Sequence, residues 1–283
     1  MELVILSGKG GTGKTTIATA LAELAKDVTR IDCDVDAPNL YMFYKGQDIE
    51  RSEFIGGKKA VIDESLCTKC GICETVCKFE AIENCKINLF ACEGCGSCTL
   101  VCPQKAISLK AEKTAETFIT KLHTGIISRA EMDIGSDGSG LLVTLLRKNG
   151  RKFNDKEKLT ILDGSPGIGC PVIASITGSD AVLAVTEPTK SGLGDLKRVV
   201  ELCEHFGVIT MVCINKYDIN EEVAKEIEDF VYDKGLKIVG KIPYDDIVMK
   251  SINELKPITC YKESIAEKAI EDMWSIIKEL FKL

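Results

Sequence analysis

A glycine-rich loop between an apolar strand and a helix constrains the fold of this chain more than any other feature. Residues 2–6 (ELVIL) form a short apolar run typical of a buried parallel strand. Residues 14–26 (KTTIATALAELAK) carry apolar side chains at helical spacing. The loop at residues 8–15 (GKGGTGKT) fits the G-x-x-x-x-G-K-[ST] pattern in its required context. A phosphate-binding loop therefore fits better than a glycine-rich turn that merely closes a βα unit.

The chemistry of this loop follows from its residue types. Glycines let backbone N–H groups approach phosphates, and the N-terminus of the following helix adds its positive dipole. Lys14 is expected to neutralise the β and γ phosphates, and Thr15 to ligate Mg²⁺. The predicted nucleotide-binding residues of the loop are Gly8, Gly10, Gly11, Thr12, Gly13, Lys14, Thr15 and Thr16.

Acidic side chains follow two other predicted strands. Asp163 closes the apolar run LTILD, and we expect it to be the partner of Mg²⁺ at the same edge of the sheet. Asp32, Asp34 and Asp36 crowd the end of the strand at residues 28–31. We expect one of them to orient the attacking water and another to lie behind the metal. The alternative is a solvated turn, since Asp favours turns.

Beyond these motifs the chain alternates between strand and helix patterns. Alternation of this kind predicts an α/β fold, a mostly parallel sheet with helices on both faces. No helix or strand is expected in the polar segment at residues 45–59. Further strands are expected at residues 116–125, 125–135, 158–167, 181–186, 209–214 and 236–242, and helices at residues 140–150 (stopped by Gly150), 189–206, 221–234 and 262–281.

Composition excludes several classes of protein. The 283 residues are 45% hydrophobic and 28% charged, as in soluble globular proteins. A net charge of -7 argues against a nucleic-acid binder that relies on phosphate contacts. No stretch approaches the ~20 apolar residues that span a membrane, and the N-terminus lacks a leader pattern. We therefore expect a cytoplasmic protein, in which fourteen cysteines indicate metal or redox chemistry.

Nine of the fourteen cysteines lie between residues 67 and 102, in two copies of a repeat of about 25 residues. Each copy reads C-x2-C-x2-C-x3-C, which resembles the bacterial ferredoxin that holds two [4Fe–4S] clusters. In that pattern three cysteines of one run hold a cluster and the fourth crosses to the other. The expected ligands are Cys67, Cys70, Cys73 and Cys102 for the first cluster, and Cys92, Cys95, Cys98 and Cys77 for the second.

Two zinc sites or a disulfide network are the alternatives for this block. Zinc normally leaves longer gaps between its cysteine pairs, and a cytoplasmic location argues against disulfides. Because the βα pattern resumes after the block, we interpret it as an insertion. The expected domains are residues 1–57 and 111–283 for the P-loop domain and residues 58–110 for the ferredoxin domain.

The motifs SGKGGTGKTT, IDCDVDAPN and LDGSPGIG resemble those of the MinD/ParA/nitrogenase-iron-protein class of ATPases. The resemblance implies an ATP-dependent sandwich dimer, in which Lys9 reaches the nucleotide of the partner subunit, much as an arginine finger does. It further implies that Asp34 handles the attacking water and that Asp32 supports Mg²⁺. Asn215, in CINKYD, and Pro243, in KIPYDD, are the expected adenine contacts. Because NKYD also resembles the N-K-x-D guanine reader, GTP stays an alternative.

The remaining cysteines receive smaller roles. Cys203 and Cys213 are expected in the core, and Cys85 is interpreted as a spare in a connecting loop. Cys170 has the offset from Asp163 of a cluster ligand in the nitrogenase iron protein, although a buried cysteine before Pro171 is the simpler interpretation. The C-terminal residues are expected to form the last sheet-covering helix rather than a membrane-binding amphipathic helix.

These observations favour an ATPase that couples ATP binding, hydrolysis and dimerisation to electron transfer from two [4Fe–4S] clusters. The acceptor would be an unidentified redox protein or metallocofactor. The resemblance is to MinD-type ATPases with an inserted ferredoxin domain. Two alternatives stay open: a scaffold or carrier that assembles Fe–S clusters, and a positioning ATPase of the MinD/ParA type with a redox-sensing module.

Overall fold

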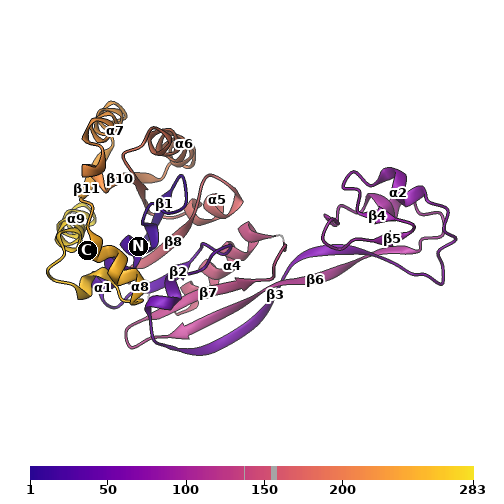
Figure 1. Ribbon diagram of the computed structural model, residues 1–283. Coiled ribbons are helices and arrows are strands. Elements are labelled where there is room, and N and C mark those ends of the chain that lie inside the picture. The colour runs from indigo at the N-terminus through magenta and orange to yellow at the C-terminus, as the bar shows by residue number, and fades with distance from the viewer. Residues whose placement is uncertain (137, 154–157) are drawn as a thin grey trace. The chain divides into compact units, whose positions relative to one another are not determined.

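The computed structural model in Figure 1 describes residues 1–136, 138–153 and 158–283. The chain divides into two compact units, and the domain expected at residues 58–110 lies within the second of them. The first unit comprises Met1–Ser52, Thr117–Glu131 and Ser139–Leu283, and the second comprises Glu53–Glu116 and Met132–Gly138.

The first unit is built on a single large sheet. Its spatial order within the described residues is β11-β10-β9-β1-β8-β2-β7-β6-β3. The strands are β1 (Glu2–Ser7), β2 (Thr29–Asp32), β3 (Gln47–Ile62), β6 (Ile107–Lys121), β7 (Ile126–Met132), β8 (Thr160–Pro166), β9 (Ala181–Thr186), β10 (Ile209–Asn215) and β11 (Lys237–Ile242).

The helices connect these strands and cover the sheet (Figure 1). In chain order they are α1 (Lys14–Ala25), the 3-10 turn η1 (Leu40–Phe43), α4 (Ser139–Lys152), α5 (Cys170–Ile176), α6 (Lys190–Phe206), η2 (Tyr217–Ile219), α7 (Glu221–Asp233), α8 (Asp246–Asn253), η3 (Ile258–Cys260) and α9 (Ile265–Phe281).

The predicted α/β fold with a mostly parallel sheet is confirmed. β1 pairs in parallel with both β8 and β9, and β2 pairs in parallel with β7 and β8. Successive residues of β1 are all buried, so both faces of the sheet are covered, as buried parallel strands require. Leu3 and Ile5 pack in one core with α1 and α9. Because β1 lies inside the sheet, the loop that follows it opens at the carboxyl edge, where α/β proteins bind ligands.

The C-terminal helix α9 is part of this core. Ile270, Met273, Trp274 and Ile277 are buried, and a Cβ at Gly240 of β11 would lie 2.6 Å from Met273 Sδ. The space above Gly240 is thus filled by Met273, and α9 packs directly on the sheet, as the sequence analysis expected.

Two expectations about secondary structure are wrong. Residues 47–59 of the polar segment belong to β3, a strand whose side chains are mostly exposed. Backbone pairing with β6 holds this strand in the sheet. Because the strand buries few of its side chains, its sequence needs no alternation of apolar and polar residues. Gly150 does not end α4, which runs to Lys152, because a Cβ at Gly150 would lie 2.9 Å from Ile31 Cδ1. Glycine is therefore present there for close packing.

The second unit contains short elements and the cysteine repeat. Strands β3 and β6 extend into it, and a small hairpin pairs Ile82 with Ile87. The two copies of the repeat have matching backbones: Gly71 and Gly96 both have positive φ directly before a short helix. The short elements are α2 (Ile72–Val76), β4 (Ile82–Glu83), β5 (Lys86–Ile87) and α3 (Ser97–Val101).

Candidate functional site

The loop between β1 and α1 has the backbone of a phosphate cradle. Gly11 and Gly13 have φ of 79° and 88°, in the left-handed region that favours glycine. Among the described residues, and apart from the adjacent ones in the chain, no atom lies within 4 Å of the position a Cβ would take at Gly10 or Gly11. Gly13 caps α1 without a side-chain hydrogen bond, so the first N–H groups of the helix stay available to an anion.

A cavity of about 560 Å³ opens beside this loop, within the size range of small-molecule sites. Phosphate-loop residues, carboxylates and apolar side chains line it together. The lining residues are Gly10, Gly11, Gly13, Lys14, Thr15, Thr16, Asp34, Asp36, Ala37, Asn39, Met42, Phe43, Ser165, Pro166, Pro171, Ile252 and Leu255.

Lys14 and Asp34 both line this cavity and form an ion pair. Both are buried, and Lys14 Nζ lies 3.6 Å from Asp34 Oδ2. Burial raises the pKa of Asp34, and the positive charge of Lys14 opposes that rise. The pair places one positive and one negative group where phosphates and a water molecule would meet.

Asp163 and Thr15 provide oxygen ligands suited to Mg²⁺. Thr15 Oγ1 donates a 2.6 Å hydrogen bond to Asp163 Oδ2, while Asp163 Oδ1 is buried without a partner among the described residues. Burial raises the pKa of Asp163 to about 6, against the opposing charge of Lys14. A buried carboxylate with an unpaired oxygen beside a hydroxyl group fits a hard divalent cation.

Asp32 does not line the cavity but lies beside Asp163 on the neighbouring strand β2. It is fully buried at the register position opposite Asp163, and burial raises its pKa well above the usual range. Its two oxygens accept the backbone N–H groups of Asp34 (3.3 Å) and Leu40 (3.1 Å). Asp32 therefore shapes the loop that carries Asp34.

Lys9 points away from the cavity. Its Nζ lies 3.7 Å from Glu187 Oε2 and within 3.5 Å of the hydroxyl groups of Thr189 and Ser191. Glu187 also accepts a 2.6 Å hydrogen bond from Lys216 Nζ. In this single chain Lys9 contacts the segment after β9 and the start of α6, and it does not line the space beside its own phosphate loop.

The two expected base contacts have different surroundings. Asn215, the last residue of β10, donates through Nδ2 to Thr12 O at 2.9 Å and so supports the phosphate loop. Pro243 follows β11 directly, and neither residue lines the cavity beside the loop. Asp218 accepts the backbone N–H of Tyr244 at 2.7 Å through Oδ1.

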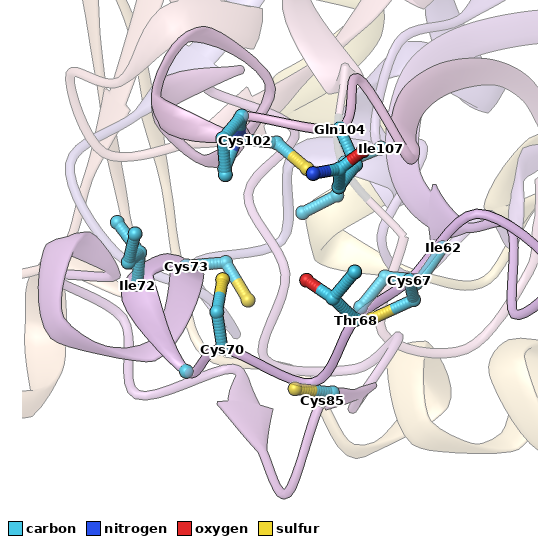
Figure 2. A pocket seen from close by; sticks show the side chains of 12 residues that line it. Ile62, Cys67, Thr68, Cys70, Ile72, Cys73, Cys85, Cys102, Gln104 and Ile107 are labelled. Carbon is cyan, nitrogen blue, oxygen red and sulfur yellow. The ribbon is translucent and has the colours of Figure 1, made fainter.

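The second unit gathers the eight repeat cysteines around two cavities. One is lined by Cys67, Cys70, Cys73 and Cys102 together with Cys85 (Figure 2). The other is lined by Cys77, Cys92, Cys95 and Cys98. Each cavity thus takes three cysteines from one copy of the repeat and the fourth from the other copy.

Backbone N–H groups point at the crossing sulfurs. Ala81 N–H donates to Cys77 Sγ and Ala106 N–H donates to Cys102 Sγ, both at 3.3 Å. Such bonds stabilise negative charge on sulfur. No three Cys, His, Asp or Glu side chains in the described part of the chain converge as they would around one metal ion. A four-iron cluster is larger than one ion, so its thiolates stand farther apart than the ligands of a single ion.

The other cysteines are distributed between core and surface, and none of the fourteen forms a disulfide. Cys203 and Cys213 are fully buried, as predicted. The expectation of a buried Cys170 is wrong: it is exposed at the first residue of α5. Cys85 lies in the β4–β5 turn, where it lines the first cavity rather than standing apart from both cysteine sets.

Sequence reasoning missed the apolar walls of the nucleotide cavity and the partner of Lys9. Met42 and Phe43 come from η1, while Ile252 and Leu255 come from the end of α8 and the residues after it. Glu187 has no motif of its own. Only the fold brings these residues to the phosphate loop, so no local pattern could have indicated them.

A phosphate loop after a central strand of a mostly parallel sheet, with a buried carboxylate on the adjacent strand, defines a P-loop nucleotide-binding protein. The CbiA family model, described as the CobQ/CobB/MinD/ParA nucleotide binding domain, matches residues 3–258. The chain therefore belongs to this family of MinD/ParA-type P-loop ATPases.

Relatives resemble this chain along nearly its whole length. An uncharacterized protein of Methanocaldococcus jannaschii is 34% identical, with 99% of this chain and 97% of the relative covered. An uncharacterized ATP-binding protein of the same organism is 28% identical over 98% of each chain. The structure of the septum site-determining protein MinD from Pyrococcus horikoshii, complexed with Mg-ADP, is 20% identical with a TM-score of 0.60, covering 99% of this chain and 96% of that one.

None of the described helices has both the length and the apolar character needed to cross a membrane.

Replacing Asp163 with Asn is expected to stabilise the nucleotide-free protein at pH 7. Because burial raises the pKa of Asp163 from 3.8 to about 6, the folded chain binds this proton more tightly than the unfolded chain. Its ionisation therefore lowers stability progressively as pH rises from about 4 to about 6. Asn should increase the free energy of unfolding at pH 7 by about 1–3 kcal/mol and remove the dependence of nucleotide binding on Mg²⁺.

Urea unfolding followed by fluorescence measures this change in the first unit, because Trp274 is the single tryptophan and lies in its core. The experiment uses a metal chelator at pH 7 and pH 4.5. Asp36→Asn at an exposed position of the same cavity is the matched control and should change little. A destabilised Asp163→Asn protein at pH 7 contradicts the prediction.

Proposed function

We propose that this protein is an ATP hydrolase that dimerises around ATP and couples that cycle to electron transfer from two [4Fe–4S] clusters in its second unit. The observation that carries the proposal is the grouping of the eight repeat cysteines into two cavities, each with four ligands in the crossed pattern. The electrons would pass to a redox protein or metallocofactor that binds this chain.

The composition of the second unit supports the clusters. Its small hydrophobic core includes Cys73, Cys92 and Cys98 as buried members, with Cys77 and Cys102 packed against it. The small core of a unit of this size gives only marginal stability, and a bound metal centre would add to it. When bound, the clusters supply one-electron chemistry, while the N–H groups of Ala81 and Ala106 stabilise the charge on their sulfur ligands.

The residues of the nucleotide site have separate roles in this proposal. Lys14 and the N–H groups of the loop bind the phosphates, and Thr15 with Asp163 holds Mg²⁺. Asp34 orients the attacking water and is itself positioned by Lys14. Lys9 acts on the nucleotide of a second copy of this chain. ATP is favoured over GTP because a relative that matches this chain along nearly its whole length is an ATP-binding protein.

A second candidate function is the assembly or transfer of Fe–S clusters. The observation that favours it is the exposed thiol of Cys170, whose neighbour Pro171 lines the nucleotide cavity. A thiol in this place could hold a cluster with a second copy of the chain. This second function predicts that clusters move from the protein to an apo-acceptor and that Cys170→Ala stops this transfer.

Anaerobic purification, followed by iron analysis, EPR spectroscopy and ATPase assays, tests the proposal. We expect about eight iron atoms per chain and a change in cluster EPR or midpoint potential when ATP replaces ADP. A chain without iron after reconstitution contradicts the clusters. Full iron content with no response to ATP contradicts the coupling alone.

A further inference from the structure

The first cysteine cavity contains one thiol more than the second. Cys85 lines it beside Cys67, Cys70, Cys73 and Cys102, and Figure 2 shows the five side chains around the same space. The second cavity is lined by four cysteines. A cubane cluster takes four thiolates, so the first cavity has a ligand in reserve.

The thiol of Cys85 lies beside two of the expected ligands. It is near enough to the thiols of Cys67 and Cys73 to interact electrostatically with each. The 25-residue offset that relates Cys67 to Cys92 takes Cys85 to Lys110. The second copy of the repeat therefore has no sulfur at the equivalent position, and the two cavities form a natural comparison.

The backbone conformation at Cys85 is one that residues with a side chain rarely adopt. Glu83 pairs with Lys86 across the β4–β5 hairpin, so Asn84 and Cys85 are the central residues of its turn. Both have positive φ, 49° and 57°, where Asn-Gly is the preferred pair. The Cys85 N–H donates to Glu74 Oε1 at 2.7 Å, which ties the turn to α2. Glycine would fit this backbone conformation better than cysteine, but glycine would not place a thiol at the cavity.

We infer that Cys85 is a reserve ligand of the first cluster, able to replace Cys67 on iron. This inference rests on the proposed function, because it requires the cluster. The exchange is redox-neutral: the Cys85 thiol gives up its proton and forms an Fe–S bond, and the Cys67 thiolate leaves iron and takes up a proton. The first cluster thereby survives the loss of Cys67, whereas the second cluster does not survive the loss of the matching Cys92.

Four variants, reconstituted anaerobically with iron and sulfide, test the inference. Cys67→Ala should keep the iron content of the wild type, about eight per chain. Cys92→Ala, its counterpart in the second cavity, should lose about half. Cys85→Gly suits the turn and should keep all the iron, while the double variant Cys67→Ala/Cys85→Gly should lose about half.

Alkylation with iodoacetamide, followed by peptide mass spectrometry, supplies a second readout. Cys85 should react in the iron-loaded wild type and become protected in iron-loaded Cys67→Ala. Equal iron loss in Cys67→Ala and Cys92→Ala, with Cys85 still reactive, overturns the inference. A wild type without iron overturns the proposed function instead.

Release of iron to a chelator tests the same point when Cys67→Ala fails to fold. A reserve thiol recaptures iron whenever Cys67 dissociates, so Cys85→Gly should speed loss of the first cluster several-fold and leave the second unchanged. Identical release from wild type and Cys85→Gly contradicts the inference.

Discussion

Lys9→Ala is expected to bind ATP with the affinity of the wild type, to stay monomeric with ATP, and to lose at least 100-fold in hydrolysis rate. Lys9 Nζ lies by Glu187 and away from the cavity beside its own phosphate loop, so its loss leaves the contacts of Lys14 intact. Its proposed target is the nucleotide of a second copy.

The energies make this role feasible. A partly exposed ion pair such as Lys9–Glu187 is worth about 0–1 kcal/mol, so releasing Lys9 costs little. A cation supplied in trans to developing phosphate charge contributes a rate factor of about 10³–10⁵ in related P-loop enzymes. The second effect outweighs the first by several kcal/mol. Glu187→Gln should therefore change the ATPase rate by less than about fivefold.

Nucleotide titration, light scattering and phosphate release measure binding, dimerisation and hydrolysis separately. Lys190→Ala is the control for charge, because Lys190 lies at the start of α6, is exposed and pairs with Glu226. It should behave as the wild type. Lys14→Ala should fail at binding itself. An ATPase rate near that of the wild type in Lys9→Ala means that Lys9 has no role in trans.

Cys102→Ala is expected to destroy the first cluster, although Cys102 belongs to the second copy of the repeat. It lines the cavity of Cys67, Cys70 and Cys73, and Ala106 N–H points at its sulfur. Cys77→Ala should conversely destroy the second cluster, which has no fifth thiol in its lining. Each variant should lose about half the iron.

EPR spectra identify which cluster each variant has lost, because each can be compared with the spectrum of a variant at another cysteine of the same cavity. The EPR spectrum of reduced Cys77→Ala should match that of Cys95→Ala, from the same cavity. The spectrum of Cys102→Ala should differ from both. If Cys77→Ala instead matches Cys73→Ala, ligands follow the sequence copies and the crossed arrangement is wrong. ATPase activity in the absence of a redox partner should stay close to that of the wild type in all of these variants.

Several features of this protein are determined by residues close together in the sequence. Glycines at fixed spacing before Lys14 and Thr15 specify the phosphate loop, because the same short segment must supply every N–H group that faces a phosphate. The close spacing within each copy of the repeat likewise brings three of its thiols to one cavity, while the fourth thiol comes from the other copy. The apolar runs at residues 2–6 and 181–186 indicated buried parallel strands, and the fold confirms them.

Contacts between distant segments were decided only by the tertiary structure. Strand β3 is mostly exposed, so backbone pairing and not side-chain pattern makes it a strand. Asp32 and Asp163 lie side by side because β2 pairs with β8, and that pairing buries two carboxylates together. Lys9 meets Glu187 across 178 positions of sequence, a contact that no local pattern encodes. Cys85 likewise joins the first cavity because a hairpin turn brings it there.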